Sequence, residues 1–375
     1  MFDKRFLQKH ARSKCVLRLT LTPLLRANSS IFIIMSNKIR WGVLGAANIA
    51  VKKVIPAMRR GDWTEMAAIA SRDLEKAKQA AEDLGIPKAY GSYEELLEDP
   101  EIEAIYNPLP NHLHVPWTIK AAEAGKHVLC EKPIALTSED ARKLLAARDK
   151  TGVKIQEAFM VRTHPQWLGV RDLIRNGRIG ELHSISGFFS YFNRDAANVR
   201  NKPETGGGAL LDIGCYAINV ARFVFGEEPR GVFGLIETDS DFGIDRLTSA
   251  ILKFPSGQAT FTCGTQIVPY QRMQFFGTGG RIEVEIPFNI PTDKPTRIFI
   301  DDGADVFGGG IETIEFAASN QYTIQGDLFS KAIRENLEQP LPLEDSVNNT
   351  AVIEAVFRSA QSGKSEIQQD VRAKL

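Results

Sequence analysis

The stretch IRWGVLGAANIA, residues 39–50, decides the fold of this 375-residue chain. Its apolar run Ile39–Leu44 predicts a buried parallel strand. Small residues follow directly, and a helix is expected to begin near Asn48. A corner of this kind presents backbone N–H groups and the positive end of a helix to an anion. We therefore expect a phosphate-binding corner formed by Gly45, Ala46, Ala47, Asn48 and Ile49.

The small residues of this corner follow the spacing of the dinucleotide-binding fingerprint G-x-G-x-x-G/A. Gly45 takes the first position and Ala50 takes the third, where alanine is allowed, but Ala47 replaces the second glycine. Many α/β domains open with a similar corner that binds nothing. The corner therefore predicts a dinucleotide site only in combination with the motifs that follow it.

Composition excludes several classes of protein. The chain carries 46 Lys and Arg against 46 Asp and Glu, so neither nucleic acid nor a membrane surface is expected as a partner. The four cysteines are widely spaced and form no metal or disulfide pattern, which predicts a reducing compartment and a cytoplasmic protein. No apolar run approaches the roughly 18 residues of a membrane-spanning helix.

Residues 1–34 differ from the rest of the chain, because they are rich in Lys and Arg and contain a single acid, Asp3. Arg18 and Pro23 interrupt their apolar segment, so a secretory signal and periplasmic export are not favoured. Met35 lies four residues before the first predicted strand, and we expect a mis-called start. A basic targeting leader and an arm that folds over the cofactor are the alternatives.

Apolar strands and amphipathic helices alternate up to residue 158, which predicts a parallel, doubly wound sheet in a Rossmann domain at 35–160. Beyond Phe159 the pattern changes to two helices, a series of strands and two closing helices. This order predicts an α+β domain at 161–375 with a mostly antiparallel, open sheet. The fold class is therefore α/β with two domains. Ligands of such parallel sheets bind at the carboxyl ends of the strands, here at Gly45, Ser71, Asn107 and Glu131.

The chain resembles a known family at six motifs over about residues 38–365. It is similar to the glucose-fructose oxidoreductase, inositol dehydrogenase and MocA-like family, and closest to its glucose-fructose oxidoreductase and pyranose dehydrogenase branch. The motifs are GAANIA (45–50), SRD (71–73), PLPNHLH (108–114), EKP (131–133), EAFM (157–160) and GGGALLDIGCY (206–216). The resemblance implies a sugar oxidoreductase with a nicotinamide cofactor.

Ser71 and Arg72 predict which cofactor is bound. An NAD-selective fold usually places an acid about 20 residues beyond the glycine turn, where it bonds the ribose 2′-hydroxyl. This chain has a hydroxyl and a guanidinium there, and both suit a 2′-phosphate. We therefore expect NADP(H), while the neighbouring Asp73 leaves some use of NAD open. The alternative is an ordinary surface arginine after a strand.

Lys132 lies between Glu131 and Pro133 at the end of a predicted strand. An ammonium there can hydrogen-bond a substrate hydroxyl, and a partly buried lysine can lower its pKa enough to relay protons. Glu131 is expected either to orient Lys132 or to cap the next helix. The family resemblance implies a cis peptide bond before Pro133. The alternative is a surface lysine in a loop.

Asp212 and Tyr216 stand four residues apart in a predicted helix, so we expect them to share a face. Most members of the family have histidine as the base at the second position. The tyrosine resembles the glucose-fructose oxidoreductase and dihydrodiol dehydrogenase branches, which implies that Tyr216 is the acid/base. A phenol with a pKa near about 10 needs a nearby positive charge to act at neutral pH. The alternative is a structural tyrosine bonded to Asp212.

Other residues complete the predicted site. The loop after the third strand is expected to position the cofactor or the substrate, whereas an i, i+2 histidine pair such as His112 and His114 is a poor metal site, and no metal is expected. Residues after the fifth strand are expected either to contact sugar hydroxyls or to hold the two domains together. The cofactor candidates of that loop are Pro108, Leu109, Asn111 and His112, and the later candidates are Met160, Arg162 and His164.

Together these residues predict an NADP-dependent oxidoreductase that transfers a hydride between C1 of a pyranose aldose, of the glucose or xylose type, and the nicotinamide, giving the lactone. Three alternatives stay open: an aldose-aldose oxidoreductase that keeps NADP(H) tightly bound and makes lactone and alditol, a dihydrodiol dehydrogenase, and a non-catalytic NADP(H)-binding sensor. The presence of both Lys132 and Tyr216 argues against the sensor. The open sheet predicts a homodimer or homotetramer.

Overall fold

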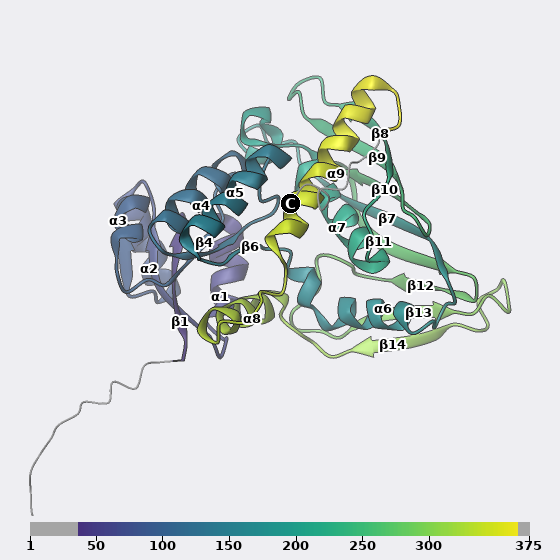
Figure 1. The fold of residues 1–375 in the computed structure, drawn as a ribbon, viewed down its shortest axis with the longest axis horizontal. Helices are drawn as coiled ribbons and strands as arrows, with labels where there is room; N and C mark the ends of the chain where they lie inside the picture. Colours follow the sequence, from purple (N-terminus) through teal and green to yellow (C-terminus); the bar gives the residue numbers. More distant parts are fainter. Residues whose placement is uncertain (1–36, 367–375) are drawn as a thin grey trace, which may run out of the picture. The chain divides into compact units, whose positions relative to one another are not determined.

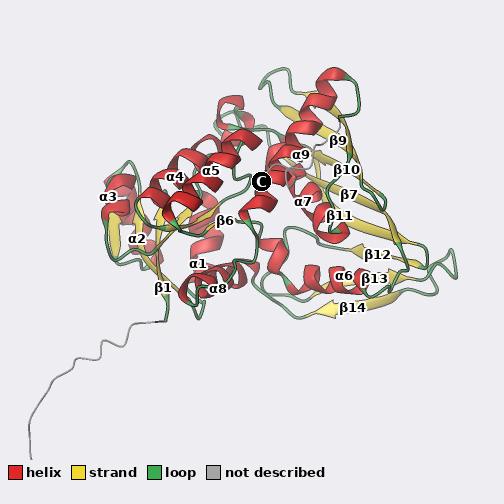
Figure 2. Cartoon of the chain, in the orientation of Figure 1, coloured by secondary structure: helices red, strands yellow, loops and turns green. Residues whose placement is uncertain are grey.

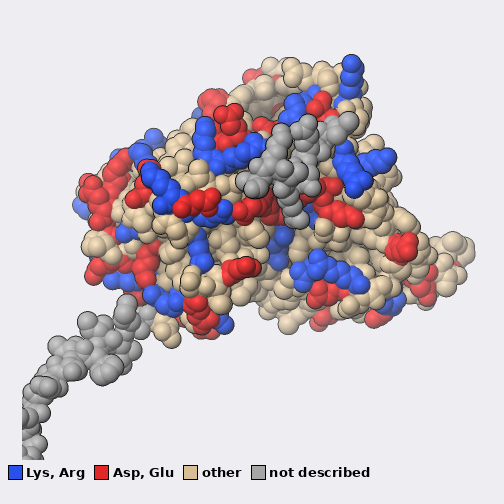
Figure 3. Space-filling model, viewed as in Figure 1, with Lys and Arg blue, Asp and Glu red and all other residues tan. Residues whose placement is uncertain are grey.

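The computed structural model describes residues 37–366. The predicted leader at 1–34 lies outside the described residues. Within the described part, the chain forms two sheets with helices packed on them (Figures 1 and 2). On the face that Figure 3 displays, acidic and basic side chains are interspersed, as the balanced charge of the sequence suggests.

Six parallel strands form the first sheet, in the order β3-β2-β1-β4-β5-β6. The strand β1 begins and ends as the apolar run predicted. The strands are β1 (Ile39–Leu44), β2 (Thr64–Ala70), β3 (Lys88–Tyr90), β4 (Ala104–Asn107), β5 (His127–Cys130) and β6 (Ile155–Glu157). The helices are α1 (Ile55–Met58), α2 (Leu74–Leu84), α3 (Tyr93–Glu98), α4 (His114–Glu123) and α5 (Ser138–Thr151). This is the predicted doubly wound parallel sheet.

Helices cover both faces of this sheet. Apolar residues of α1 and α2 pack on one face, and α3, α4 and α5 pack on the other. The first face also receives Phe329 from α8 (Gln321–Arg334), close to the end of the chain. Figure 1 shows α8 beside α1. The late helix α8 thus belongs to the core of the first sheet, although the predicted second domain begins at residue 161.

Eight strands form the second sheet, in the order β14-β13-β12-β11-β7-β10-β9-β8. All pairs are antiparallel except β7 with β10, which confirms the predicted mostly antiparallel sheet. The strands are β7 (Leu182–Phe192), β8 (Gly231–Thr238), β9 (Asp245–Lys253), β10 (Gln258–Gly264), β11 (Gln266–Gly277), β12 (Gly280–Val284), β13 (Thr296–Asp301) and β14 (Glu312–Phe316). Apolar residues of α6 (Pro165–Arg175), α7 (Cys215–Phe225) and α9 (Leu343–Ser362) pack on one face of the sheet.

Two predicted helices differ from the structure at their starts. The helix expected over 49–60 contains a π-helical turn, η1 (Ala50–Val54), before α1. The helix expected over 208–225 likewise starts with a π-helical turn, η6 (Leu210–Gly214), before α7. Such turns occur mainly at functional sites. The apolar stretch Pro203–Phe225 is long enough to span a membrane by composition, but 89% of its most apolar window is buried within the protein.

Candidate active site

The turn after β1 has the backbone geometry of an anion-binding corner. Gly45 has a φ of +89°, a left-handed conformation that favours glycine. A Cβ atom at Gly45 would lie 3.3 Å from both Leu109 Cδ2 and Tyr93 Oη. Helical structure begins at Asn48, as predicted, and Asn48 is exposed. The predicted corner residues therefore lie between the end of β1 and a helical N-terminus, where backbone N–H groups can meet phosphate oxygens.

The three residues that follow β2 differ in their contacts. The Asp73 carboxylate accepts hydrogen bonds from the backbone N–H groups of Glu75 and Lys76, so it caps α2, as the sequence suggested. Ser71 Oγ accepts a hydrogen bond of 3.3 Å from the Asp73 N–H. Arg72 is exposed. One oxygen of the acid at this strand end is thus bonded to the helix, while the arginine side chain is exposed.

Tyr93 is a neighbour of the cofactor corner that the sequence did not identify. Burial raises the pKa of the Tyr93 phenol, and the adjacent Arg72 guanidinium opposes this rise. The Tyr93 hydroxyl also faces Gly45. The first turn of α3 therefore contributes a hydroxyl between the glycine turn and the predicted 2′-phosphate ligand. Its position just after β3 was the available signal, but β3 is short and was not predicted.

The loop after β4 is held by buried polar contacts. Asn107 Nδ2 donates to His114 O at 3.1 Å, and Asn107 Oδ1 accepts from the Leu109 N–H at 3.3 Å. The two ring nitrogens of His114 lie 2.7 Å from Pro133 O and 2.6 Å from Leu109 O. The His114 ring therefore links the loop after β4 to the loop after β5. The sequence did not predict this role.

Two predicted cofactor residues of this loop occupy different settings. Asn111 Nδ2 donates to Gly206 O at 2.8 Å, so the Asn111 amide joins this loop to the segment before η6. His112 is exposed beside it. Pro108 and Leu109 are buried and lie at the carboxyl end of β4, near the glycine turn. Direct contact of these four residues with a cofactor stays a prediction.

Glu131 is held at the carboxyl end of β5. Its Oε1 accepts a hydrogen bond of 2.6 Å from the Tyr106 hydroxyl, and its Oε2 accepts from the Lys132 backbone N–H at 3.3 Å. Thr137 caps the following helix, so the expectation that Glu131 might cap it is wrong. The peptide bond between Lys132 and Pro133 is cis, as the family resemblance implied.

Lys132 reaches from the first sheet to the π-helical turn η6. Its Nζ donates to the Asp212 backbone oxygen at 2.6 Å and lies 3.3 Å from Asp212 Oδ1. Only 12% of each side chain is exposed. Burial by itself would raise the pKa of Asp212, but Arg200 and Lys132 hold this pKa well below its usual range. Asp212 is therefore a carboxylate that fixes the position of the lysine ammonium.

The ion pair of Lys132 with Asp212 contradicts one expectation that we drew from the sequence. We expected burial to lower the pKa of Lys132 enough for proton relay. Burial does act in that direction, but the Asp212 carboxylate outweighs it and raises the pKa above its usual value. Lys132 is thus a permanent cation at neutral pH, suited to polarising a substrate oxygen rather than to exchanging its proton.

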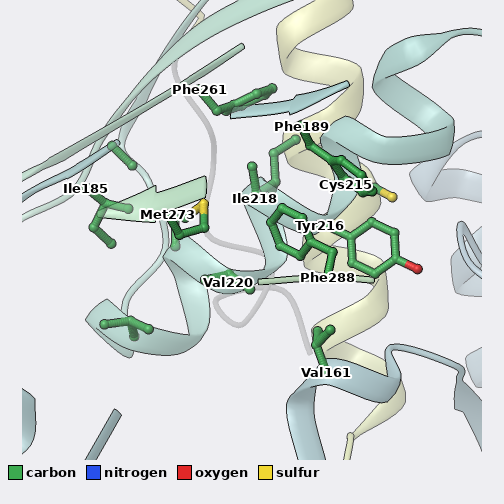
Figure 4. Packing of buried hydrophobic residues seen from close by; sticks show 14 of the residues in the cluster. Val161, Ile185, Phe189, Cys215, Tyr216, Ile218, Val220, Phe261, Met273 and Phe288 are labelled. Atoms are coloured by element: carbon green, nitrogen blue, oxygen red, sulfur yellow. The ribbon is translucent and has the colours of Figure 1, made fainter. Parts of the chain in front are cut away.

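Tyr216 lies in a buried aromatic cluster and is 5% exposed. Its ring centroid lies 5.4 Å from that of Phe159 and 5.3 Å from that of Phe288. Figure 4 shows Tyr216 beside Phe288, with its hydroxyl directed away from Phe189. The hydroxyl lies 3.6 Å from Met160 Sδ. The hydroxyl is therefore not bonded to Asp212, as the structural alternative expected, because the Asp212 carboxylate contacts Lys132, Tyr191 and Arg200 instead.

Lys132 connects the two predicted catalytic residues of the helix. Its Nζ lies 5.0 Å from the Tyr216 ring centroid and in hydrogen-bonding distance of Asp212. Asp212 lies within the π-helical turn η6 and Tyr216 lies in α7, and each of them has its own contact with Lys132. Burial raises the pKa of the Tyr216 phenol, so the phenol is protonated at neutral pH. The three residues nevertheless meet at one place.

Arg162 and His164 have structural contacts. Arg162 Nη1 donates to Asp345 Oδ2 at 3.0 Å and to Asn219 Oδ1 at 3.2 Å, which ties η3 (Met160–Thr163) to α7 and α9. His164 is 1% exposed and accepts a hydrogen bond from the Gln166 N–H at the start of α6. The Arg162 contacts fit the expected role of holding parts of the molecule together, the His164 contact caps the helix that directly follows it, and a sugar contact of either residue stays a prediction.

Comparison with known proteins agrees with this geometry. A family model described as "Oxidoreductase family, NAD-binding Rossmann fold" matches residues 39–159, and one described as "GFO/IDH/MocA C-terminal domain" matches residues 167–283. The chain belongs to the GFO/IDH/MocA oxidoreductase family. It is an oxidoreductase, and its Rossmann domain is of the NAD-binding kind.

Individual members of the family span nearly the whole described chain. An uncharacterized oxidoreductase from Rhizobium meliloti is 49% identical over 88% of this chain and 98% of its own. D-xylose 1-dehydrogenase (NADP(+)) 2 from Haloferax volcanii is 36% identical over 86% of this chain and 98% of its own. The structure of a 3-ketoreductase from Actinomadura kijaniata, in complex with NADP and TDP-benzene, has a TM-score of 0.80 and 31% identity, covering 86% of this chain and 98% of that one.

Two residues of this oxidoreductase site were missed by sequence analysis. Tyr191, on β7, donates its hydroxyl proton to Asp212 Oδ2 at 2.6 Å, and Arg200 Nε donates to the same oxygen at 3.0 Å. Tyr191 follows the alternation of buried residues in β7, which was a usable signal. Arg200 lies in an irregular segment and gave none. Asp212 therefore joins three hydrogen-bond donors from three separate segments.

Proposed function

We propose that this oxidoreductase transfers a hydride from C1 of a pyranose aldose, of the glucose or xylose type, to NADP, and so forms the lactone. The observation that carries the proposal is the meeting of Lys132, Asp212 and Tyr216 beside the carboxyl ends of the Rossmann strands. An ammonium and a phenol in such a position fit the oxidation of an alcohol. The similarity to D-xylose 1-dehydrogenase supports an aldose as the substrate.

Each side chain has a distinct part in this reaction. NADP, when bound, would supply the hydride acceptor. Tyr216 exchanges the proton of the C1 hydroxyl, and Lys132, which the Asp212 carboxylate keeps charged, hydrogen-bonds that oxygen and stabilises negative charge on it. Because burial raises the pKa of Tyr216, the neutral phenol is the resting form. We expect aldose oxidation to become faster as pH rises, since the base form is the phenolate.

NADP rather than NAD is proposed as the cofactor. Asp73 Oδ1 is bonded to the first turn of α2, while the exposed Arg72 guanidinium is available to a 2′-phosphate. The xylose dehydrogenase and the ketoreductase structure are both named with NADP. A tightly held cofactor that shuttles between two sugars remains the alternative mode of the same site.

The proposal is tested with a substrate panel. The purified protein is incubated with NADP and, in turn, xylose, glucose and a trans-dihydrodiol, and formation of NADPH is followed by absorbance. We expect many turnovers with an aldose and few with the diol. Protein purified without added nucleotide is also given an aldose and then fructose. Reduction and reoxidation of a bound cofactor would establish the shuttle, and turnover of the diol alone would contradict the aldose proposal.

We also propose that the open face of the second sheet binds a second copy of the chain. The described helices of this domain pack on the opposite face. On β8 and β9, the apolar side chains of Phe233, Leu235 and Ile251 are 42%, 68% and 47% exposed. Leu235→Glu should dissociate the oligomer in light scattering coupled to size exclusion. Val306→Glu, at a loop residue that is 93% exposed, is the control.

A further inference from the structure

The segment between β7 and η6 carries Arg200 at the edge of the site. Asp212 and Lys132 each have side chains that are 12% exposed, whereas the Arg200 side chain is 45% exposed. Arg200 is therefore the most exposed of these three side chains. Its Nε is bonded to Asp212, and within residues 37–366 its two terminal nitrogens have no hydrogen-bond partner. These two nitrogens are donors without an acceptor in the described protein.

The backbone that carries Arg200 is firmly placed. Its carbonyl accepts a hydrogen bond of 3.0 Å from the Gly208 N–H, and Asn201 Nδ2 donates to Asp195 O at 2.9 Å. A Cβ atom at Gly207 would lie 2.5 Å from Arg200 O, so a larger residue at 207 would displace the arginine. The three consecutive glycines at 206–208 thus allow this segment to pack against the start of η6.

Asp212 connects Arg200 to the reacting centre. Its Oδ2 accepts from Arg200 and Tyr191, and its Oδ1 faces Lys132 Nζ. One carboxylate therefore sets the positions of two cations. If Lys132 meets the oxygen on C1 of a substrate, Arg200, bonded to the other oxygen of the same carboxylate, is placed to reach oxygens on C2 and C3. A guanidinium with two donors in a plane suits two adjacent acceptor oxygens.

We propose that Arg200 determines substrate specificity by donating hydrogen bonds, through its terminal nitrogens, to the hydroxyl on C2, next to the reacting C1 of the sugar, and to the hydroxyl on C3. This inference rests on the proposed function. The site then requires a substrate with a run of adjacent hydroxyl groups, as in a pyranose. Arg200 acts on recognition, while Tyr216 and Lys132 act on the reaction itself.

The test combines a change in the enzyme with a change in the sugar. The rate constant kcat/KM is measured for glucose and 2-deoxyglucose with the wild-type protein and Arg200→Gln, at saturating NADP. Losing a hydrogen bond from a charged donor should lower kcat/KM for glucose by about 10- to 100-fold, mainly through KM. The loss should be much smaller for 2-deoxyglucose, which lacks one of the proposed acceptors. If Arg200 acted in folding alone, the substitution would lower kcat/KM equally for both sugars.

Two further variants separate recognition from structure. Arg194→Gln changes an exposed arginine of the same segment that pairs with Asp241, and it should leave both sugars unchanged. Tyr191→Phe removes a bond to Asp212 but no donor to the sugar, so its effect should be the same for both sugars. If the wild type turns over glucose and Arg200→Gln lowers kcat/KM equally for both sugars, the inference about Arg200 is wrong while the proposed function stands. Absence of aldose turnover in the wild type would overturn the proposed function and the inference with it.

Discussion

Arg72 and Asp73 are adjacent in the sequence, but the structure gives them different partners. The Asp73 carboxylate is bonded to the first turn of α2, and the Arg72 side chain is exposed near Tyr93. At the scale of single residues, the proposed preference for NADP therefore rests on the arginine. One oxygen of the neighbouring acid, which on sequence grounds left NAD open, is bonded to α2.

Replacing Arg72 should change cofactor preference. Arg72→Ala should raise the KM for NADP by about 10- to 100-fold, because it removes a charge-assisted partner of the 2′-phosphate, and should leave the KM for NAD nearly unchanged. Steady-state kinetics with both cofactors provide the measurement. Arg60→Ala, at an exposed arginine after α1, is the control. An equal rise in KM for NADP and for NAD would show that Arg72 has another role.

Asp245 predicts a pH dependence of stability. Its Oδ2 accepts hydrogen bonds from the Leu210 N–H at 2.7 Å and from the Thr248 hydroxyl at 2.9 Å. Burial raises the pKa of Asp245 from 3.8 to about 6. The folded protein therefore holds the Asp245 proton more tightly than the unfolded chain does. The resulting contribution of protonated Asp245 to the free energy of unfolding is complete below a pH of about 4 and is lost as pH rises through about 6.

Asp245→Asn should remove this dependence, since the amide oxygen can still accept the Leu210 hydrogen bond but cannot ionise. The free energy of unfolding is measured in urea at several pH values between about 4 and 7 for both proteins. Between the lowest and the highest pH, the free energy of unfolding of the wild type should fall relative to that of the variant by on the order of 1–3 kcal/mol. A difference that does not change with pH would contradict the assignment.

At the scale of elements, the cap of α2 can be separated from the cofactor site. Asp73→Ala should lower the free energy of unfolding by about 1 kcal/mol, the usual cost of losing an N-cap, while the ratio of NADP to NAD activity stays the same. Asp73→Asn retains a capping acceptor and should cost much less. A gain or loss of NAD activity in Asp73→Ala would mean that the carboxylate acts on the ribose after all.

Elements with strong local signals could be predicted from the sequence, and those fixed by distant contacts could not. The apolar run before Gly45 predicted β1, and Asp73 predicted the start of α2, because both signals are local. The short strands β3 and β14 were missed, since β3 is only half-buried and β14 is partly exposed. The π-helical turn η6 has no sequence pattern that distinguishes it from an α-helix.

The candidate site shows the same division. Lys132, Asp212 and Tyr216 could be named because they lie in motifs, and the structure brings them together. Tyr191 and Arg200 are 21 and 12 residues from Asp212, and only the folded chain reveals their contact with it. Two roles stayed open for Arg162, a sugar contact and a structural contact, because its partners Asn219 on α7 and Asp345 on α9 lie far away in the sequence.

At the scale of the whole molecule, α8 links the end of the chain to the first sheet. Phe329 is fully buried with its ring centroid 6.0 Å from that of Trp41, and Trp41 Nε1 donates to Ser330 Oγ at 3.0 Å. The cofactor domain is therefore completed by residues that follow the second sheet in the sequence. A chain that ends before α8 would lose the part of this face's cover that Phe329 provides over Trp41, while α1 and α2 would remain.

Phe329→Ala should destabilise the Rossmann core. Removing a buried phenylalanine leaves a cavity and should lower the free energy of unfolding by about 3–5 kcal/mol. Leu328→Ala, at a neighbouring residue that is 40% exposed, is the control and should cost far less. Urea unfolding followed by tryptophan fluorescence measures both, and Trp41 reports on the affected region. Similar small losses in the two variants would show that α8 is dispensable for this core.

The central claim is that the residues meeting at Lys132 oxidise an aldose, and Tyr216→Phe tests it most directly. The substitution keeps the ring in its aromatic cluster and removes only the hydroxyl that exchanges the proton. The measurement is kcat for NADPH formation with xylose or glucose, with NADP binding and thermal stability determined in parallel and Tyr270→Phe as the matched control. The account predicts a fall in kcat by about 10²–10⁴ in Tyr216→Phe, with cofactor binding retained and the control unaffected. Near-normal kcat in Tyr216→Phe would contradict it.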